Sequence, residues 1–403
     1  MVDDGGRDSA LSALAGLLDN GHLAPPDAIP DVVLDAGRML GWTVVVYVVD
    51  FEQRVLTPLM PSGFEPREAY DVDTTVAGRC FRNTTPVVVG DDSPRVWAPL
   101  IDGVERLGVL CIDMPGAVDV EGESTREHLR WFSHLTGHLV AAKAAYGDAL
   151  HLARLTRQRT IESELIWSLL PPLTGACTGL LISGVLEPAD VVAGDVFDYS
   201  IVDGVAHVGI FDATGHDLKS SLIGALAISA YRNERRRRHD LRETASAVDR
   251  VLAEFEMDTL ATGVLGQIDI GTGRFRYVNA GHPSPLLVRQ GKVVKELDGG
   301  RRILFGIGSS EATPADEQLE AGDWIVMYTD GVIEARDLER NFFGIDRFID
   351  LLERSAANAQ PPPETLRRVT HAVLEHQQGV LQDDATILLI EWQGTGAEEM
   401  IAD

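Results

Sequence analysis

The stretch of sequence that decides the fold is residues 194–217, GDVFDYSIVDGVAHVGIFDATGHD. Two apolar, β-branched runs, Val196 to Ile201 and Val205 to Phe211, flank an Asp-Gly turn signal, which predicts two strands joined by a tight turn. Asp195 precedes the first strand and Asp212 follows the second. Because strand ends can converge at one edge of a sheet, acids that are separated in sequence can meet there.

Aspartates stand at the ends of predicted strands in four segments of the C-terminal half: Gly194–Asp198, Phe211–Asp217, Tyr328–Val332 and Gln382–Thr386. Carboxylates brought together repel one another unless protons or cations intervene. No His or Cys cluster stands beside them, so the set suits a hard cation, Mg²⁺ or Mn²⁺. Two such ions, about 3.5–4 Å apart, can activate water and clamp a phosphoryl oxygen. A single aspartate of this kind is more often a turn former, so the chemistry rests on all four together.

The rest of the C-terminal half alternates hairpins with two predicted helices, Leu218–Tyr231 and Thr244–Phe255. Strands are predicted at 264–270, 275–279, 286–288, 324–328 and 385–392. Hairpin-connected strands with few helices favour an antiparallel sandwich that carries helices on its faces, an α+β architecture.

Bulk composition bounds the function. The chain has 403 residues and a net charge of −27, so two domains are expected, and neither nucleic acid nor an anionic membrane is an expected partner. Its three cysteines, Cys80, Cys111 and Cys177, form neither a disulfide framework nor a zinc pattern. We see no signal peptide and no run of about 20 apolar residues, so we expect a cytoplasmic protein.

The N-terminal half begins with a stretch, residues 1–24, that we expect to be a flexible tail. A helix at 28–40 and strands at 43–49, 54–59, 86–89, 96–101 and 107–112 follow. The next helix is expected to begin with Ser124 as its cap and Glu127 closing a capping box. An apolar stripe then continues through 147–172, a helical linker. This stripe could pair with a second copy to form a homodimer, or it could pack on its own domain.

Five motifs follow in order in the C-terminal half: Val192–Asp195, Asp212–His216, Asn279–Pro283, Tyr328–Gly331 with Glu334–Arg336, and Asp383–Thr386. With them, residues 181–392 resemble the PPM metal-dependent protein phosphatases, in the bacterial branch related to the stage II sporulation phosphatase. The resemblance implies an α/β/β/α sandwich over 173–395, followed by a tail at 396–403, and two bound ions, Mn²⁺ or Mg²⁺.

The same resemblance implies a role for each matching residue. Asp195 would bind one metal, Asp212 would bridge both, and the carbonyl of Ala213 would complete a shell. Asp330 and Asp383 would hold the other metal, with Asp384 beside them as an alternative ligand. His216 would serve as a general acid or, equally, as a structural histidine. The turn at Asn279–Pro283 is assigned no chemistry.

Two departures from the family pattern stand in the first two motifs. The family usually has Gly where Ala193 and Asp217 stand. No arginine that holds the phosphate is evident. The Arg235–Arg238 run is expected to be a solvated helix end, or to dock an acidic partner.

Residues 25–146 resemble a GAF domain through the strand at 43–49 and the motifs Ala77–Cys80, Val96–Leu100 and Leu107–Leu110. Such domains often bind a small ligand, and some only dimerise. The resulting hypothesis is a serine/threonine phosphatase under control of this domain. It would act on a phosphorylated regulatory protein, an anti-sigma-factor antagonist. Two alternatives stay open: a silent phosphoprotein-binding scaffold and a hydrolase of small phosphoesters.

Overall fold

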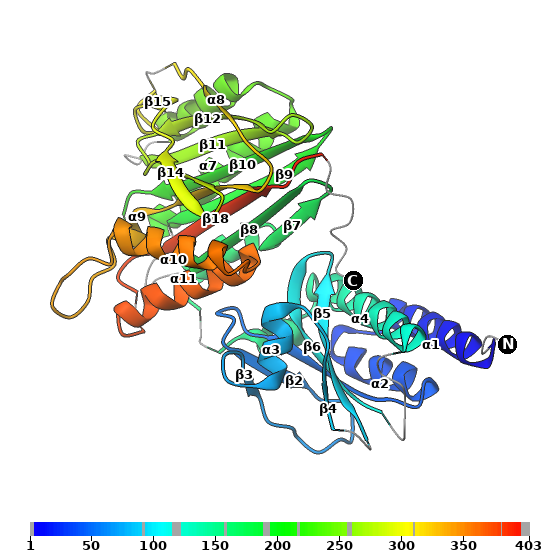
Figure 1. Ribbon diagram of the computed structural model, residues 1–403. Helices are drawn as coiled ribbons and strands as arrows, with labels where there is room; N and C mark the ends of the chain where they lie inside the picture. Colours follow the sequence, from blue (N-terminus) through cyan, green and yellow to red (C-terminus); the bar gives the residue numbers. More distant parts are fainter. Residues whose placement is uncertain are drawn as a thin grey trace. The chain divides into compact units, whose positions relative to one another are not determined.

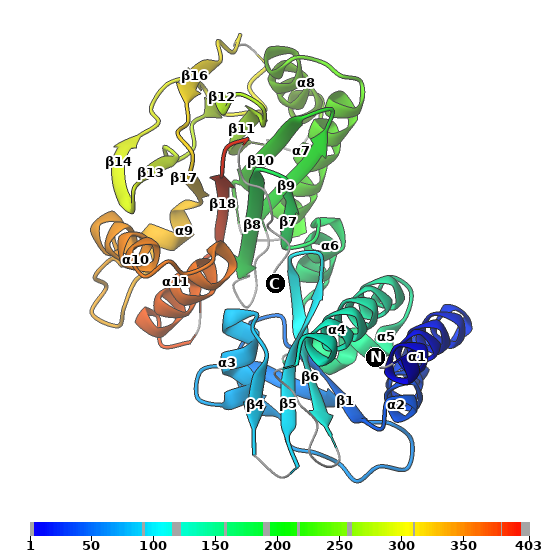
Figure 2. The same ribbon diagram turned by 45° about the vertical axis from the view of Figure 1, so that its right-hand side comes forward.

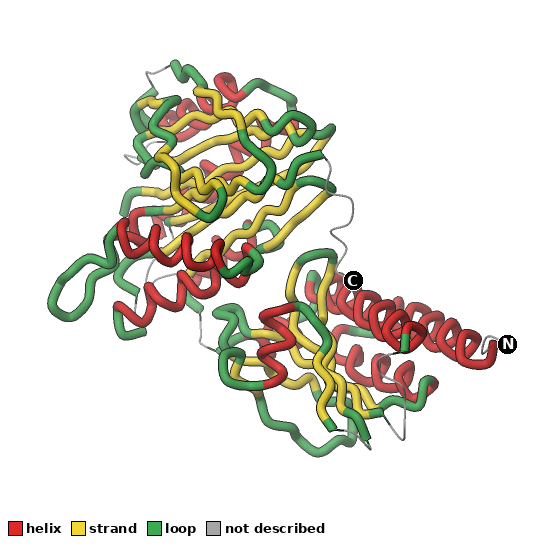
Figure 3. The backbone as a smooth tube through the Cα atoms, in the orientation of Figure 1, coloured by secondary structure: helices red, strands yellow, loops and turns green. Residues whose placement is uncertain are grey.

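The computed structural model describes residues 4–90, 93–114, 122–156, 159–187, 194–215, 218–255, 260–308, 311–379 and 381–395, with the side chains described from residue 9 onward. The chain forms two compact units, residues 1–158 and 159–403, and each is described here by itself (Figure 1). Helices and strands alternate in both units (Figure 3).

The N-terminal unit is built on one antiparallel sheet, in the order β3-β2-β1-β6-β5-β4. Its strands are β1 (Thr43–Val49), β2 (Val55–Leu59), β3 (Tyr70–Asp71), β4 (Val87–Val89), β5 (Arg95–Asp102) and β6 (Glu105–Asp113). Its helices are α1 (Asp4–Leu23), η1 (Pro26–Ala28), α2 (Ile29–Met39), α3 (Val76–Asn83), α4 (Glu123–Ala144) and α5 (Asp148–Arg154).

Alternation along β1 explains how this unit buries both faces of its sheet. Val44, Val46 and Val48 pack in one cluster with residues of α1, α2, α4 and α5. Val45 and Tyr47 point the other way, into a cluster with α3. Figure 2 shows α3 on the opposite side of the sheet from α1, α2 and α4.

Two predictions for this unit are wrong. The expected flexible tail contains helix α1, in which Leu17 is 0% exposed, because Ala10, Ala13 and Leu17 form an apolar face that packs into the core. The expected cap of α4 is also wrong: the helix begins at Glu123, Gly122 is its N-cap residue, and no side chain caps it.

The C-terminal unit is a sandwich of two sheets, as predicted. The first has the order β15-β12-β11-β10-β9, with β16 paired to β12, and the second has the order β14-β13-β17-β18-β8-β7. The first sheet contains β9 (Asp195–Val202), β10 (Val205–Ala213), β11 (Ala261–Asp269), β12 (Arg274–Ala280), β15 (Arg301–Arg302) and β16 (Ala315–Gln318). The second contains β7 (Thr174–Cys177), β8 (Leu180–Glu187), β13 (Leu286–Arg289), β14 (Lys292–Glu296), β17 (Asp323–Tyr328) and β18 (Ala385–Trp392).

Helices cover the outer faces of this sandwich. Figure 2 shows α7 (Leu218–Arg236) and α8 (Leu241–Glu254) on the first sheet, and Figure 1 shows α10 (Ile345–Ala357) and α11 (Pro362–His376) on the second. The short helix α9 (Asp330–Ile333) follows β17. Strand β18 is buried on both sides: Leu388 and Ile390 lie in the cluster between the sheets, and Ile387 and Leu389 lie in the cluster under α10 and α11. Layers in this order are the α/β/β/α arrangement that the resemblance implied.

The segment predicted as a helical linker contains α5 and a second helix, α6 (Ile161–Leu169), which belongs to the C-terminal unit. Thr160 caps α6 by accepting a hydrogen bond from the amide of Ser163 (3.3 Å). Ile166 lies inside the C-terminal core, and Trp167 and Leu169 pack against it. For these residues the apolar stripe packs on its own domain. Ile161 is 78% exposed.

Membrane insertion through a helix finds no support among the described residues, where no helix is long and apolar enough to cross a bilayer.

Candidate metal centre

The hairpin of β9 and β10 brings the first two predicted ligands together. Asp195 is the first residue of β9 and lies directly opposite Asp212, near the end of β10, in the antiparallel register. Asp195 is only 3% exposed, and Asp212 is half-buried. Two carboxylates are therefore held side by side at one edge of the first sheet, as the sequence predicted.

Burial and mutual repulsion both disfavour charge on these two groups. The pKa of Asp212 is raised to about 8, first by burial and then by the carboxylates of Asp330, Asp383 and Asp384. The pKa of Asp195 is raised well above its usual value by burial, by Asp212 and by Asp384. Carboxylates from three separate parts of the chain thus act on one another, so the structure brings all the predicted aspartates to one place.

Asp330 and Asp383 come from the second sheet. Asp330 is the first residue of α9, directly after β17, and Asp383 precedes β18, the strand that pairs with β17. The two segments approach closely at Gly331, where an added Cβ would lie 2.0 Å from the carbonyl oxygen of Asp384. The glycine that we expected to admit an ion instead admits the neighbouring main chain.

Asp384 differs from Asp383 in what its carboxylate contacts. The Oδ2 atom of Asp384 accepts hydrogen bonds from the amides of Gly194 (2.7 Å) and Asp195 (3.4 Å). The Asp383 side chain is exposed and accepts from the amide of Asp384 (3.0 Å). Asp384 therefore fastens the start of β9 to the start of β18, while Asp383 faces solvent.

Thr329 is a residue of the site that the sequence analysis missed. Its hydroxyl donates to Oδ2 of Asp195 (2.6 Å) and accepts from the amide of Thr386 (3.1 Å). The bond to Asp195 links the two sheets and orients a predicted ligand. Its position directly before Asp330 is the signal that could have revealed it.

The carbonyl oxygen of Ala213 lies at the same edge of the sheet. A Cβ added at Gly194 would lie 2.8 Å from it, and the amide of Ala213 donates to the carbonyl of Gly194 (3.3 Å). The predicted general acid His216, together with Asp217 and Ala193, lies outside the described residues.

The donor set fits hard divalent cations in its chemistry. It consists of carboxylates and a carbonyl oxygen, and its buried members repel one another in the way that a bound cation relieves. Within the part of the chain that the structure describes, no group of three or more His, Cys, Asp or Glu side chains has an arrangement that could hold an ion by itself. The carboxylates thus converge without forming a closed ligand shell.

The Arg235–Arg238 run does not form the solvated helix end that we expected. Arg235 and Arg232 both pair with Asp198, at 2.5 and 2.7 Å, and Asp198 is 2% exposed. Arg237 pairs with Glu234 and Arg238 with Asp203. The run therefore fastens the end of α7 to the hairpin of β9 and β10.

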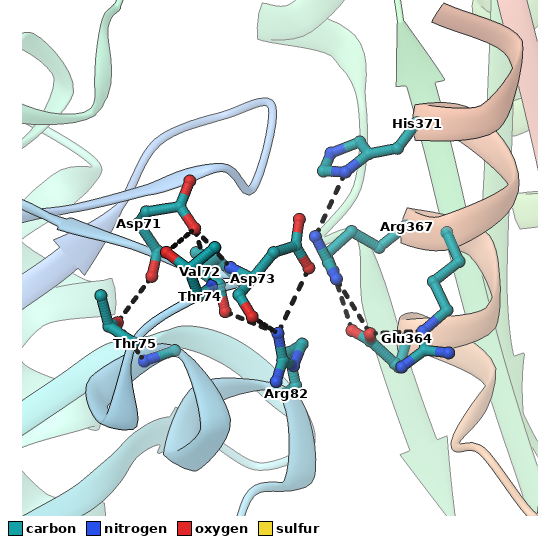
Figure 4. Close-up of polar contacts among 11 residues, drawn as sticks. Asp71, Val72, Asp73, Thr74, Thr75, Arg82, Glu364, Arg367 and His371 are labelled. Carbon is teal, nitrogen blue, oxygen red and sulfur yellow. Dashed lines mark hydrogen bonds and ion pairs between the residues drawn. The ribbon is translucent and has the colours of Figure 1, made fainter. Parts of the chain in front are cut away.

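Other polar clusters fix helix ends within a single unit (Figure 4). At the start of α3, Asp71 accepts from the amides of Asp73 and Thr74, at 2.9 and 2.8 Å, and Thr75 caps the helix. In α11, Glu364 accepts from Nε and Nη2 of Arg367, at 2.9 and 3.0 Å. These contacts stabilise local structure.

Residues 203–393 match the family described as Stage II sporulation protein E (SpoIIE). The C-terminal unit carries a SpoIIE domain. Around this SpoIIE domain, the chain is 26% identical over 274 residues to Protein IcfG of Synechocystis sp. (strain ATCC 27184 / PCC 6803 / Kazusa), a match that covers 60% of this chain and 42% of that protein. The chain thus spans less than half the length of this curated relative.

Two solved structures share similarity with the region of the SpoIIE domain. The RsbU and RsbW domains of Rv1364c from Mycobacterium tuberculosis are 27% identical with a TM-score of 0.49, over 55% of this chain and 62% of that chain. The SiaA-PP2C domain of Pseudomonas aeruginosa is 25% identical with a TM-score of 0.47, over 52% of this chain and 85% of that chain.

Proposed function

We propose that the SpoIIE domain is a metal-dependent protein phosphatase that removes phosphate from serine or threonine of a regulatory protein. The observation that carries this proposal is the pairing of Asp195 with Asp212 at a buried sheet edge, where Asp330 and Asp383 approach from the second sheet. Carboxylates that raise one another's pKa are an arrangement suited to divalent cations.

In this proposal each residue has a distinct task. Two bound Mn²⁺ or Mg²⁺ ions would supply an activated water and neutralise charge on the phosphoryl group. Asp212 would bridge the ions, Asp195 and the Ala213 carbonyl would hold one, and Asp330 and Asp383 would hold the other.

Two further residues would orient these ligands. Thr329 orients Asp195 through its 2.6 Å hydrogen bond, and Asp384 holds the main chain at Gly194. Fixed ligands keep the phosphoryl group in line with its attacking water, and such positioning is a large part of catalysis.

The direct test is hydrolysis of an aryl phosphate and a phosphoserine peptide with Mn²⁺ or with a chelator. We expect Mn²⁺-dependent turnover in the wild type and its loss in Asp212→Asn. The matched control is Asp203→Asn, at the opposite end of the same hairpin, where Asp203 is exposed and pairs with Arg238. Turnover that survives both the chelator and Asp212→Asn would contradict the proposal.

The proposed substrate is a phosphorylated anti-sigma-factor antagonist, and support for this comes from the SpoIIE match. A phosphoprotein of this class should be hydrolysed with a much higher kcat/KM than an aryl phosphate. Equal values of kcat/KM would favour a hydrolase of small phosphoesters instead.

We also propose that the N-terminal unit, a GAF-like domain by resemblance, controls the phosphatase through α6. Inside the C-terminal unit, Ile166 of α6 lies 3.6 Å from the position of a Cβ built on Gly224 of α7, and the same Cβ would lie 2.9 Å from the carbonyl of Gly194. Arg232 of α7 also donates to the carbonyl of Leu169 (2.5 Å). A displacement of α6 would thus act on α7 and on the start of β9.

The proposed homodimer would use the part of the stripe that the core leaves exposed, at Ile161. Sedimentation of the full chain tests this: Ile161→Glu should convert a dimer to a monomer and change the turnover. A monomeric wild type would refute the proposed homodimer. Unchanged turnover in the monomeric variant would refute its role in control.

A further inference from the structure

The turn at residues 281–285 is where the chain passes from the first sheet to the second. It follows β12, which pairs with β11, and it leads into β13, which pairs with β17. Asn279 holds the turn by accepting from the amide of His282 (2.9 Å), and Arg301 donates to the carbonyl of His282 (2.8 Å). The turn is therefore a fixed bridge between the two layers.

His282 is the one side chain of this turn that reaches toward both halves of the metal centre. Its Nδ1 atom lies 2.7 Å from the hydroxyl of Thr262. Thr262 is directly opposite Asp212 in the register of β10 and β11. On the other side, the imidazole interacts with the main chain of Tyr328, two residues before Asp330.

The ring is buried and neutral. His282 is 2% exposed, and burial lowers its pKa to about 3, against a smaller opposing effect of the Tyr328 main chain. A neutral imidazole carries one N–H donor and one acceptor nitrogen, so it can serve two neighbours at once. Its Nε2 atom makes no hydrogen bond of normal geometry, so the interaction with Tyr328 is the weaker of the two.

We propose that His282 is a positioning residue, which sets the spacing between the Asp212 end of the first sheet and the Asp330 end of the second. This inference rests on the proposed function, because it assigns Asp212 and Asp330 to the metal centre. The carboxylates that hold different ions come from different sheets, so their separation depends on what joins the sheets at this edge. Thr262, His282 and the turn itself form that joint.

The test measures Mn²⁺ binding by the full chain without substrate, from the electron paramagnetic resonance signal of free Mn²⁺. His282→Leu removes both ring nitrogens, and Thr262→Val removes only the hydroxyl. Each should weaken Mn²⁺ binding by about tenfold, as loss of an outer-shell partner does. The double variant should be no weaker than either single variant, since both remove the same bond.

Two further variants separate positioning from general damage. His282→Gln keeps a carboxamide that can accept from Thr262 and should restore most of the binding. His207→Leu is the matched control: His207 faces Gln267 across the same two strands at 3.5 Å, at the opposite end from Asp212. It should leave Mn²⁺ binding unchanged.

The outcomes are distinguishable. Wild-type Mn²⁺ affinity in folded Thr262→Val would overturn the inference, and so would an equal loss of affinity in His207→Leu. If His282→Leu fails to fold, Thr262→Val decides, because it removes a single hydroxyl group. Wild-type protein that binds no Mn²⁺ would overturn the proposed function itself, and the inference with it.

Discussion

Replacing Gly331 with alanine tests the centre at its tightest contact. The added Cβ would lie 2.0 Å from the carbonyl oxygen of Asp384, whereas real Cβ atoms essentially never approach other atoms within 3.0 Å. The start of α9 and the segment before β18 must therefore separate by about 1 Å. That movement pulls Asp330 away from Asp383, the two residues proposed to hold the same ion.

The expected loss follows from that displacement. Misplacement of catalytic groups by about 1 Å typically costs roughly a hundredfold in rate, and overpacking of a core costs about 1–3 kcal/mol. We expect Gly331→Ala to lower Mn²⁺-dependent hydrolysis of an aryl phosphate by roughly a hundredfold. It should also lower the free energy of unfolding, measured in urea, by about 1–3 kcal/mol.

Gly271→Ala is the control for that variant. Gly271 lies in the turn between β11 and β12, where an added Cβ would meet only Oδ1 of Asp269, at 3.5 Å. This variant should behave as the wild type. Gly331→Ala with turnover within about twofold of wild type would refute the reasoning, because a displaced Asp330 could not support it.

Three further predictions concern buried acids. Asp383→Asn should abolish Mn²⁺-dependent turnover, whereas Asp384→Asn, which keeps an acceptor for the amide of Gly194, should retain most of it; equal loss would show that Asp384 is a ligand. The pKa of Asp50 is raised to about 6 by burial, so its folded form favours the proton, and this stability is lost as the pH rises from about 4 to about 6. Urea titrations should show wild type losing roughly 3 kcal/mol relative to Asp50→Asn over that interval, and parallel curves would contradict this. Asp198→Ala should cost about 3–5 kcal/mol of unfolding free energy, because it leaves Arg235 buried without its partner; a cost under about 1 kcal/mol would show that the pair is solvated.

Local pattern carried much of the fold. The run at 43–49 forms β1 and the run at 385–392 forms β18, because a buried strand must be apolar over its whole length. Pattern failed where packing decides: α1 is amphipathic too weakly to stand out, and it is ordered by burial of Leu17. The cap of α4 also escaped prediction, since Glu123 extends the helix one residue before the expected Ser124.

The sequence by itself determined which residues stand at strand ends, and it placed Asp195 and Asp212 together because a hairpin is a local structure with a fixed register. Only the tertiary structure decided what meets across the two sheets. Thr329 reaches Asp195, and Asp384 holds Gly194, through contacts between residues that are 134 and 190 positions apart in sequence. Such contacts depend on how two layers stack, and no spacing along the chain encodes that stacking directly.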